Sequence, residues 1–212
     1  MGPITGETII KEPWGPSCAL LVFPGGADLG FCRTLNGEGN RRIRQYVNLG
    51  GAYLGLCAGG YYGSKRCEFE VGNEDMEVSG DRGLEFFPDV CRGSAFPGFV
   101  YKSEVGTHAA KLKIEKGSFT CVESVLPDGF RSYSNGGGVF VDAAKHGHRG
   151  VEILASYEET LQVDPGQGAA AVVYCTVGEG RAILTGPHPE LVLKGTVLSG
   201  TDKFQICFCQ LQ

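Results

Sequence analysis

The chain has 212 residues, a net charge of −5 and a pI near 5.4, with 42% hydrophobic and 20% charged residues. This balance suits one globular domain over residues 1–212, with a core at 5–190 and a tail of uncertain role at 191–212. Because basic residues form no block and no apolar run approaches the ~18 residues of a membrane span, we expect neither nucleic acid nor a membrane as a partner.

Cysteine usage indicates the compartment. The nine cysteines are an odd number and form no C-x-x-C pair, and several lie in or beside apolar runs. Free thiols of this kind are typical of a reducing environment. The first residues also lack the charged and apolar regions of a secretory signal. We therefore expect a cytoplasmic protein.

The first recognisable unit is strand, helix, strand. Residues 18–23 form a short apolar run that predicts a strand buried on both faces. Residues 36–49 place apolar side chains at helical spacing and are followed by Gly50 and Gly51, which predict a helix end. A second apolar run at 52–56 completes a βαβ unit, which requires a parallel sheet covered by helices.

The rest of the chain is less regular. Residues 67–98 are polar and predict an irregular surface segment. Alternating apolar residues then predict short antiparallel strands at 99–101, 111–114, 130–133, 139–141 and 151–154. Two further apolar runs, at 169–175 and 180–185, flank a Gly-containing turn and predict a hairpin.

The most informative stretch is Gly55-Leu-Cys57-Ala-Gly59, directly after the strand at 52–56. A nucleophile elbow places its nucleophile on a strained turn between strand and helix, with small neighbours on both sides. A cysteine there lies at a helix N-terminus, which favours the thiolate. Cys57 is therefore a candidate nucleophile. The alternative is a small buried core residue, which is what most free cysteines are.

The second candidate is His188, which stands between two prolines and two residues before Glu190. Prolines hold a segment extended, and in an extended segment residues two apart point the same way. The Glu190 carboxylate can then fix the tautomer and orientation of the imidazole, while His188 moves a proton for Cys57. The alternative is a capping or surface histidine at a turn.

The third candidate is an oxyanion hole. Gly25 and Gly26 follow the first strand, where active-site loops of parallel sheets collect. Their backbone N–H groups, with that of Ala58 just after the nucleophile, can hold a developing oxyanion. The alternative is an ordinary turn.

These motifs resemble a known family. The stretches Phe23-Pro-Gly-Gly-Ala-Asp28, Gly55-Leu-Cys-Ala-Gly-Gly-Tyr-Tyr-Gly-Ser64, Cys67-Glu-Phe-Glu70 and Gly186-Pro-His-Pro-Glu190 are similar to the N-terminal glutamine-amidotransferase-like domain of eukaryotic, especially fungal, biotin–protein ligases. More distantly, the chain resembles class I glutamine amidotransferases, which carry a Cys-His-Glu triad. The resemblance implies a flavodoxin-like three-layer α/β sandwich, with a mostly parallel central sheet and an inserted set of antiparallel strands.

Three departures qualify this resemblance. Gly59-Gly60-Tyr61 stands where working glutamine amidotransferases usually carry Gly-His-Gln, which puts glutamine as substrate in doubt. The family domain normally has a further strand and helix before the part equivalent to residue 5, so we expect the N-terminal βα unit to be missing. Nothing resembles the Gly-Arg-Gly-Arg stretch of the ligase catalytic domain, so we expect no biotin ligation by this chain alone.

Other candidate sites are weaker. The pairs His146/His148 and Cys207/Cys209 lack a second pair at plausible spacing, and no Gly-x-Gly-x-x-Gly lies between a strand and a helix. We therefore predict neither a metal nor a cofactor. Three carboxylates close to the main motifs are candidates for lining a pocket, although each is more often solvated or capping: Asp28, Glu68 and Glu70.

Two hypotheses of function follow. In the first, the chain is a Cys-His-Glu amide hydrolase that acts through a thioester on a small-molecule or peptide amide. In the second, it is a non-catalytic regulatory or interaction module with a protein partner in biotinylation.

Overall fold

The computed structural model describes residues 2–118 and 126–191. The helical elements are α1 (Gly6–Lys11), η1 (Gly15–Ser17), α2 (Asp28–Leu35), α3 (Glu38–Asn48), α4 (Ala58–Gly63), η2 (Lys116–Ser118) and η3 (Ala143–Arg149). The strands are β1 (Leu21–Phe23), β2 (Ala52–Leu56), β3 (Ser64–Phe69), β4 (Val78–Asp81), β5 (Phe87–Gly93), β6 (His108–Ile114), β7 (Gly129–Ser134), β8 (Val139–Phe140), β9 (Val151–Tyr157), β10 (Ala170–Val177) and β11 (Gly180–Thr185).

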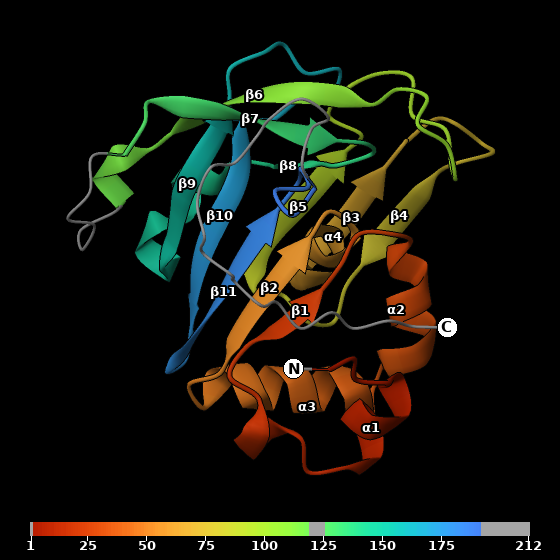
Figure 1. Ribbon diagram of the computed structural model, residues 1–212, viewed down its shortest axis with the longest axis vertical. Helices are drawn as coiled ribbons and strands as arrows, with labels where there is room; N and C mark the ends of the chain where they lie inside the picture. The colour runs from red at the N-terminus through yellow and green to blue at the C-terminus, as the bar shows by residue number, and fades with distance from the viewer. Residues whose placement is uncertain (1, 119–125, 192–212) are drawn as a thin grey trace.

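Three neighbouring parallel strands position the candidate site. β2 lies between β1 and β11, and Gly55 of β2 pairs with Phe23 on one side and with Leu184 on the other. Figure 1 shows the three strands side by side, pointing the same way. The loops after their carboxyl ends therefore meet at one edge of the sheet, where ligands of α/β proteins commonly bind.

The sheet continues as a mixed, curled sheet. Beyond β11 the order is β10, β8, β5, β3 and β4, with a further parallel pair between β3 and β5. β9 pairs antiparallel with β10, and β6 joins β9 to β7. Figure 1 shows β6 and β7 crossing over the top of the other strands. The α/β class, with a parallel set and additional antiparallel strands, is confirmed.

The core beneath the site is aromatic. The Phe23 ring of β1 lies 5.0 Å from Phe31 of α2, 5.3 Å from Tyr53 of β2 and 5.3 Å from Tyr62 of α4, measured between ring centroids. All four rings are buried. Burying side chains of this size is the dominant favourable contribution to folding. These contacts fix α2 and α4 against the strands whose ends carry the site.

Several element predictions are confirmed. The βαβ unit forms with parallel β1 and β2, the predicted helix appears as α3, and β10 and β11 make the predicted hairpin. The first strand is shorter than expected and begins at Leu21. The missing N-terminal βα unit stays a prediction.

Two element predictions are wrong. Residues 99–101 form no strand, and the segment 67–98, expected to be irregular, contains the second half of β3 and all of β4 and β5. The polar composition of residues 67–98 does not indicate a loop, because charged side chains of this segment pair with one another across neighbouring strands. Glu68 of β3, for example, accepts hydrogen bonds from Arg66 at 3.1 Å and from Arg92 of β5 at 2.9 Å.

Candidate active site

Cys57 occupies the sharp turn between β2 and α4. Its backbone has φ 50° and ψ −101°, a conformation that costs a non-glycine residue about 1–3 kcal/mol. The neighbouring glycines are required by close packing, since a Cβ on Gly55 would lie 2.3 Å from the Gly59 carbonyl oxygen, and a Cβ on Gly59 would lie 2.1 Å from that of Phe23. The Cys57 N–H donates to the Thr185 carbonyl at 2.8 Å, which ties this turn to β11.

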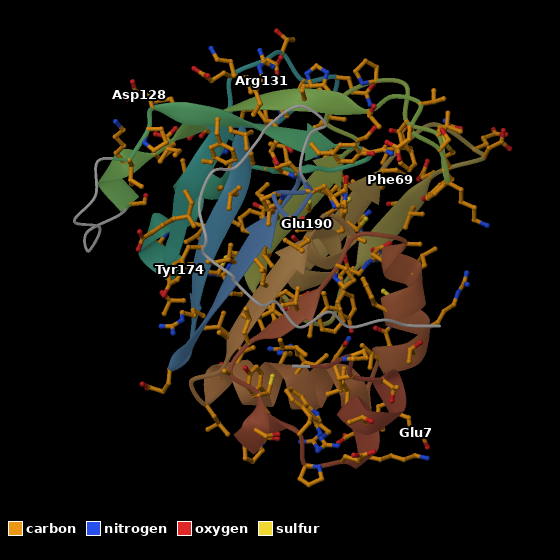
Figure 2. The ribbon with its side chains drawn as sticks, in the orientation of Figure 1. Glu7, Phe69, Asp128, Arg131, Tyr174 and Glu190 are labelled. Carbon is orange, nitrogen blue, oxygen red and sulfur yellow. The ribbon has the colours of Figure 1, made fainter. Side chains whose placement is uncertain are left out.

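His188 is held by its own backbone. Its N–H donates to the Tyr133 carbonyl at 2.7 Å, in an isolated bridge to β7. Its Nδ1 lies 2.7 Å from Oε1 of Glu190, and the two side chains are 12% and 13% exposed. Figure 2 shows Glu190 close to the carboxyl ends of β2 and β11.

The backbone conformation between His188 and Glu190 differs from the expected one. The sequence predicted an extended segment, but residues 188–191 form a turn in which the Leu191 N–H donates to the His188 carbonyl at 3.2 Å. The expectation of an extended chain is therefore wrong, and Glu190 reaches the imidazole around the turn. The predicted contact between the two side chains forms nonetheless.

The Cys57 side chain lies close enough to the His188 imidazole to raise its pKa. Burial by itself lowers the pKa of His188, because it disfavours the charged ring. The hydrogen bonds to Cys57 and Glu190, and the negative charges of these two groups, raise the pKa more strongly, to about 10. The Cys57 Sγ also lies 3.9 Å from the Asn135 carbonyl oxygen. An imidazole in this position holds its proton at neutral pH.

Backbone amide groups border the same site. A Cβ on Gly25 would lie 2.2 Å from Cε1 of His188, so the backbone of this loop lies directly against the imidazole. Gly26 has a φ of +136° and lines the same cavity as Cys57 and Ala58. Ala58 is the first residue of α4, where backbone N–H groups have no partner within the helix.

A cavity of about 460 Å³ opens beside Cys57 and His188. This volume lies in the range of small-molecule sites. Much of its lining is aromatic or aliphatic, from side chains on α4, β3, β4 and the loops after β5 and β11: Tyr61, Phe69, Val78, Phe99, Tyr101 and Leu191.

The structure thus brings together Cys57, His188, Glu190, Gly25, Gly26 and Ala58. Asp28 also lines the cavity, as the sequence suggested. Glu68 and Glu70 do not line it. Glu68 pairs with Arg66 and Arg92, and Glu70 accepts a hydrogen bond from the Ser94 N–H at 3.1 Å.

Sequence reasoning missed the contribution of two short segments, 101–102 and 133–136. Lys102, Tyr133 and Asn135 line the cavity, and the last two contact His188 and Cys57 through their backbones. The sequence predicted a strand at 99–101 and gave Phe99 no place at the site, whereas Phe99 lines the cavity. No spacing or motif in these segments points to the site, because the approach of 133–136 depends on the pairing of β7 with β6.

No group of three or more metal-ligating side chains occurs in residues 2–118 and 126–191. His146 bonds to Asp89 at 2.8 Å, and Cys207 and Cys209 lie outside the described residues. None of the helices in the described ranges is long and apolar enough to cross a bilayer.

Comparison with known proteins identifies the family. A family model described as "Biotin-protein ligase, N terminal" matches residues 1–206. The chain belongs to this family. A biotin–protein ligase of Schizosaccharomyces pombe is 41% identical to this chain over 193 residues, and a protein of Chlamydia muridarum is 36% identical over 189 residues. The sequence-based assignment to the biotin–protein ligase N-terminal family is confirmed.

The extent of these matches differs between the two proteins. The alignments cover 91% and 88% of this chain, but only 29% of the yeast protein and 66% of the chlamydial one. Among solved structures, a β-galactosidase from Bacillus circulans matches 81% of the domain and 20% of its own chain, at 12% identity and a TM-score of 0.42. A match at that level supports no argument about function.

Proposed function

We propose that this biotin–protein ligase N-terminal-type domain is a cysteine-dependent amide hydrolase. In this proposal the Cys57 thiolate attacks the amide carbonyl carbon and forms a C–S bond. The C–N bond then breaks, and His188 gives its proton to the leaving amine. Water, deprotonated by His188, hydrolyses the thioester and releases a carboxylic acid, so that one amide and one water yield one acid and one amine.

The other site residues have supporting roles. Glu190 holds the His188 ring through Nδ1, which leaves the second ring nitrogen for Cys57 and the substrate. The N–H groups of Gly25 or Gly26, together with that of Ala58, stabilise the oxyanion of the tetrahedral intermediates. Removing one such donor typically costs about 10²–10³ in kcat.

The observation that carries the proposal is the contact of His188 with both Cys57 and Glu190 beside a cavity. A raised pKa of about 10 keeps His188 protonated, and a neighbouring imidazolium favours the thiolate form of a cysteine. The strained backbone at Cys57 is further support, since such strain concentrates at functional sites. A place in the wider class I glutamine amidotransferase group is part of the same proposal.

Two measurements test this proposal: the rate at which Cys57 is alkylated and the rate of amide hydrolysis. Cys57 is expected to react with iodoacetamide at pH 6.5 at least about 10-fold faster than an ordinary cysteine, and His188→Gln to remove that advantage. Cys57→Ala is expected to abolish amide hydrolysis, whereas Cys18→Ala, outside the cavity, leaves hydrolysis unchanged. If Cys57 reacts like an ordinary thiol and no amide is hydrolysed, the hydrolase proposal fails.

The second candidate is a non-catalytic module with a protein partner in biotinylation. It is favoured by the yeast relative, in which the region similar to this chain makes up 29% of a protein named as a biotin–protein ligase. Adding this chain to a biotin–protein ligase lacking its own N-terminal domain tests it. A change in biotinylation rate that survives Cys57→Ala supports the module, and an unchanged rate rejects it.

A further inference from the structure

We propose that the cavity beside Cys57 accepts amides whose acyl group is apolar and carries no ammonium group, so that free glutamine is a poor substrate. This inference rests on the proposed function, because it names the substrate class of the same site. Two independent features support it: the aromatic wall of the cavity, and the ion pair that already neutralises the carboxylate in its lining.

The aromatic wall is a continuous series of rings. Tyr61 lies 5.8 Å from Phe69, Phe69 lies 5.3 Å from Phe99, and Phe99 lies 4.9 Å from Tyr101, measured between ring centroids. The series begins on α4, in the turn directly after Cys57, and ends on the loop after β5. Figure 2 shows Phe69 at the end of β3.

The wall is buried at one end and open at the other. Tyr61 and Phe69 are 4% and 7% exposed, whereas Tyr101 is 41% exposed. Val78 and Leu191 add aliphatic surface to the same cavity. An acyl group bound to Cys57 that extends along this wall removes apolar surface from water on both partners, which is the main source of affinity in such sites.

The charges of the cavity disfavour an ammonium group. Among the lining residues that the structure describes, Asp28 is the one carboxylate, and its Oδ2 accepts a hydrogen bond from Nε of Arg82 at 2.7 Å. Both side chains of this pair are buried. Asp28 is therefore already neutralised, and an ammonium brought into the cavity would lose its hydration without gaining a counter-charge.

A second acidic side chain, that of Glu104, contacts a residue of the cavity lining. Glu104 accepts a hydrogen bond from the Tyr133 hydroxyl at 2.7 Å and does not line the cavity. Among the described residues that line the cavity, Lys102 is the exposed side chain that carries a charge, a positive one. Lys102 therefore disfavours an ammonium group on its side of the cavity and tolerates a neutral or anionic one.

Binding to Cys57→Ala protein is the decisive experiment, because it does not depend on turnover. Calorimetry would compare 3-phenylpropanamide and hexanamide with L-glutamine. We expect both apolar amides to bind at least about 10-fold more tightly than glutamine. Equal or tighter binding of glutamine, or no binding of either apolar amide, overturns the inference.

Hydrolysis by the unaltered protein separates this inference from the proposed function. If the apolar amides bind to Cys57→Ala protein but none is hydrolysed by the unaltered chain, the hydrolase proposal fails while the cavity assignment stands. If glutamine is hydrolysed with the higher kcat/KM, the hydrolase proposal stands and the substrate class is wrong.

A matched pair of variants tests the wall itself. Tyr101 and Phe130 are 41% and 40% exposed, but only Tyr101 lines the cavity. Tyr101→Ala is expected to weaken binding of 3-phenylpropanamide to Cys57→Ala protein about 10-fold, and Phe130→Ala to leave that binding unchanged. Equal effects of the two substitutions on binding would show that the aromatic wall does not bind the acyl group.

Discussion

Nδ1 of His188 lies 2.7 Å from Oε1 of Glu190, and Glu190 and Cys57 both raise the pKa of this imidazole. The second carboxylate oxygen of Glu190 is buried and has no partner among the described residues. A buried carboxylate with a single hydrogen-bonding partner depends strongly on the charge of that partner. The protonation of His188 is therefore coupled to both of its neighbours.

NMR titration of the histidines measures this coupling directly. The His188 imidazole is expected to titrate with a midpoint near 10, because its bonds to Cys57 and Glu190 raise the pKa more than burial lowers it. Cys57→Ala and Glu190→Gln should each move the midpoint down toward the ordinary value of ~6.5. His188→Gln identifies the signal by its loss. A midpoint near 6.5 in the unaltered chain would contradict the assigned contacts.

The same pKa sets a pH dependence of stability. The pKa of His188 is higher in the folded chain than the ~6.5 of an unfolded one, so folding is favoured while the ring is protonated. This stabilisation is complete below pH ~6.5 and is lost as the pH rises through about 10. Urea unfolding should show the largest advantage over His188→Gln near pH 6 and the smallest above pH 10. An advantage that grows with pH would contradict this sign.

Local features of the site were predictable from sequence, because they depend on neighbouring residues. The glycines around Cys57 and the strand before it specify a tight turn wherever the chain places it, and the turn forms as expected. The order of the motifs, together with parallel β1, β2 and β11, brings Gly25, Cys57 and His188 to one edge.

Non-local features were not predictable. The cavity wall needs Phe99 and Tyr101, whose positions depend on the packing of a loop against β3, and no residue pattern encodes that approach. β3 and β4 were overlooked because charged residues on their open faces hide the strand alternation. Arg66, for instance, pairs with Asp81 on the neighbouring strand at 3.2 Å. Contacts of this kind appear only once the strands are paired.

The buried ion pair between Asp28 and Arg82 is expected to matter for folding. Their side chains are 9% and 4% exposed, and Arg82 also donates to the Gly80 carbonyl at 2.8 Å. Removing one partner leaves a buried charge without compensation, which typically costs about 3–5 kcal/mol. Asp28→Asn and Arg82→Met should each lower the free energy of unfolding by that amount, measured in urea.

An exposed pair and a double variant serve as controls. Figure 2 shows Glu7 at the outer edge of the molecule, and its partner Lys11 is 68% exposed, so Glu7→Gln should hardly change the unfolding transition. The double variant of Asp28→Asn with Arg82→Met should lose less than the sum of the single changes. Strict additivity would show that the two side chains do not interact.

Gly25→Ala tests the position of the imidazole against the glycine loop. The added Cβ would lie 2.2 Å from Cε1 of His188 and 3.1 Å from Nε2, so the imidazole must shift from its present position beside the glycine loop. A displacement of about 1 Å at a catalytic group can cost about 100-fold in rate. We expect amide hydrolysis and rapid alkylation of Cys57 to fall together, and the His188 pKa to fall as its bond to Cys57 is lost.

Gly30→Ala is the matched control, because nothing lies within 4 Å of a Cβ at that position in α2. Replacing a glycine inside a helix by alanine stabilises by about 0.5–1 kcal/mol, so this variant should unfold at slightly higher urea with unchanged alkylation of Cys57. Gly25→Ala, in contrast, should keep a cooperative unfolding transition while losing the reactivity of the thiol. If Gly25→Ala leaves that reactivity intact, the loop does not hold the imidazole against Cys57, and the oxyanion role given to its amides loses its support.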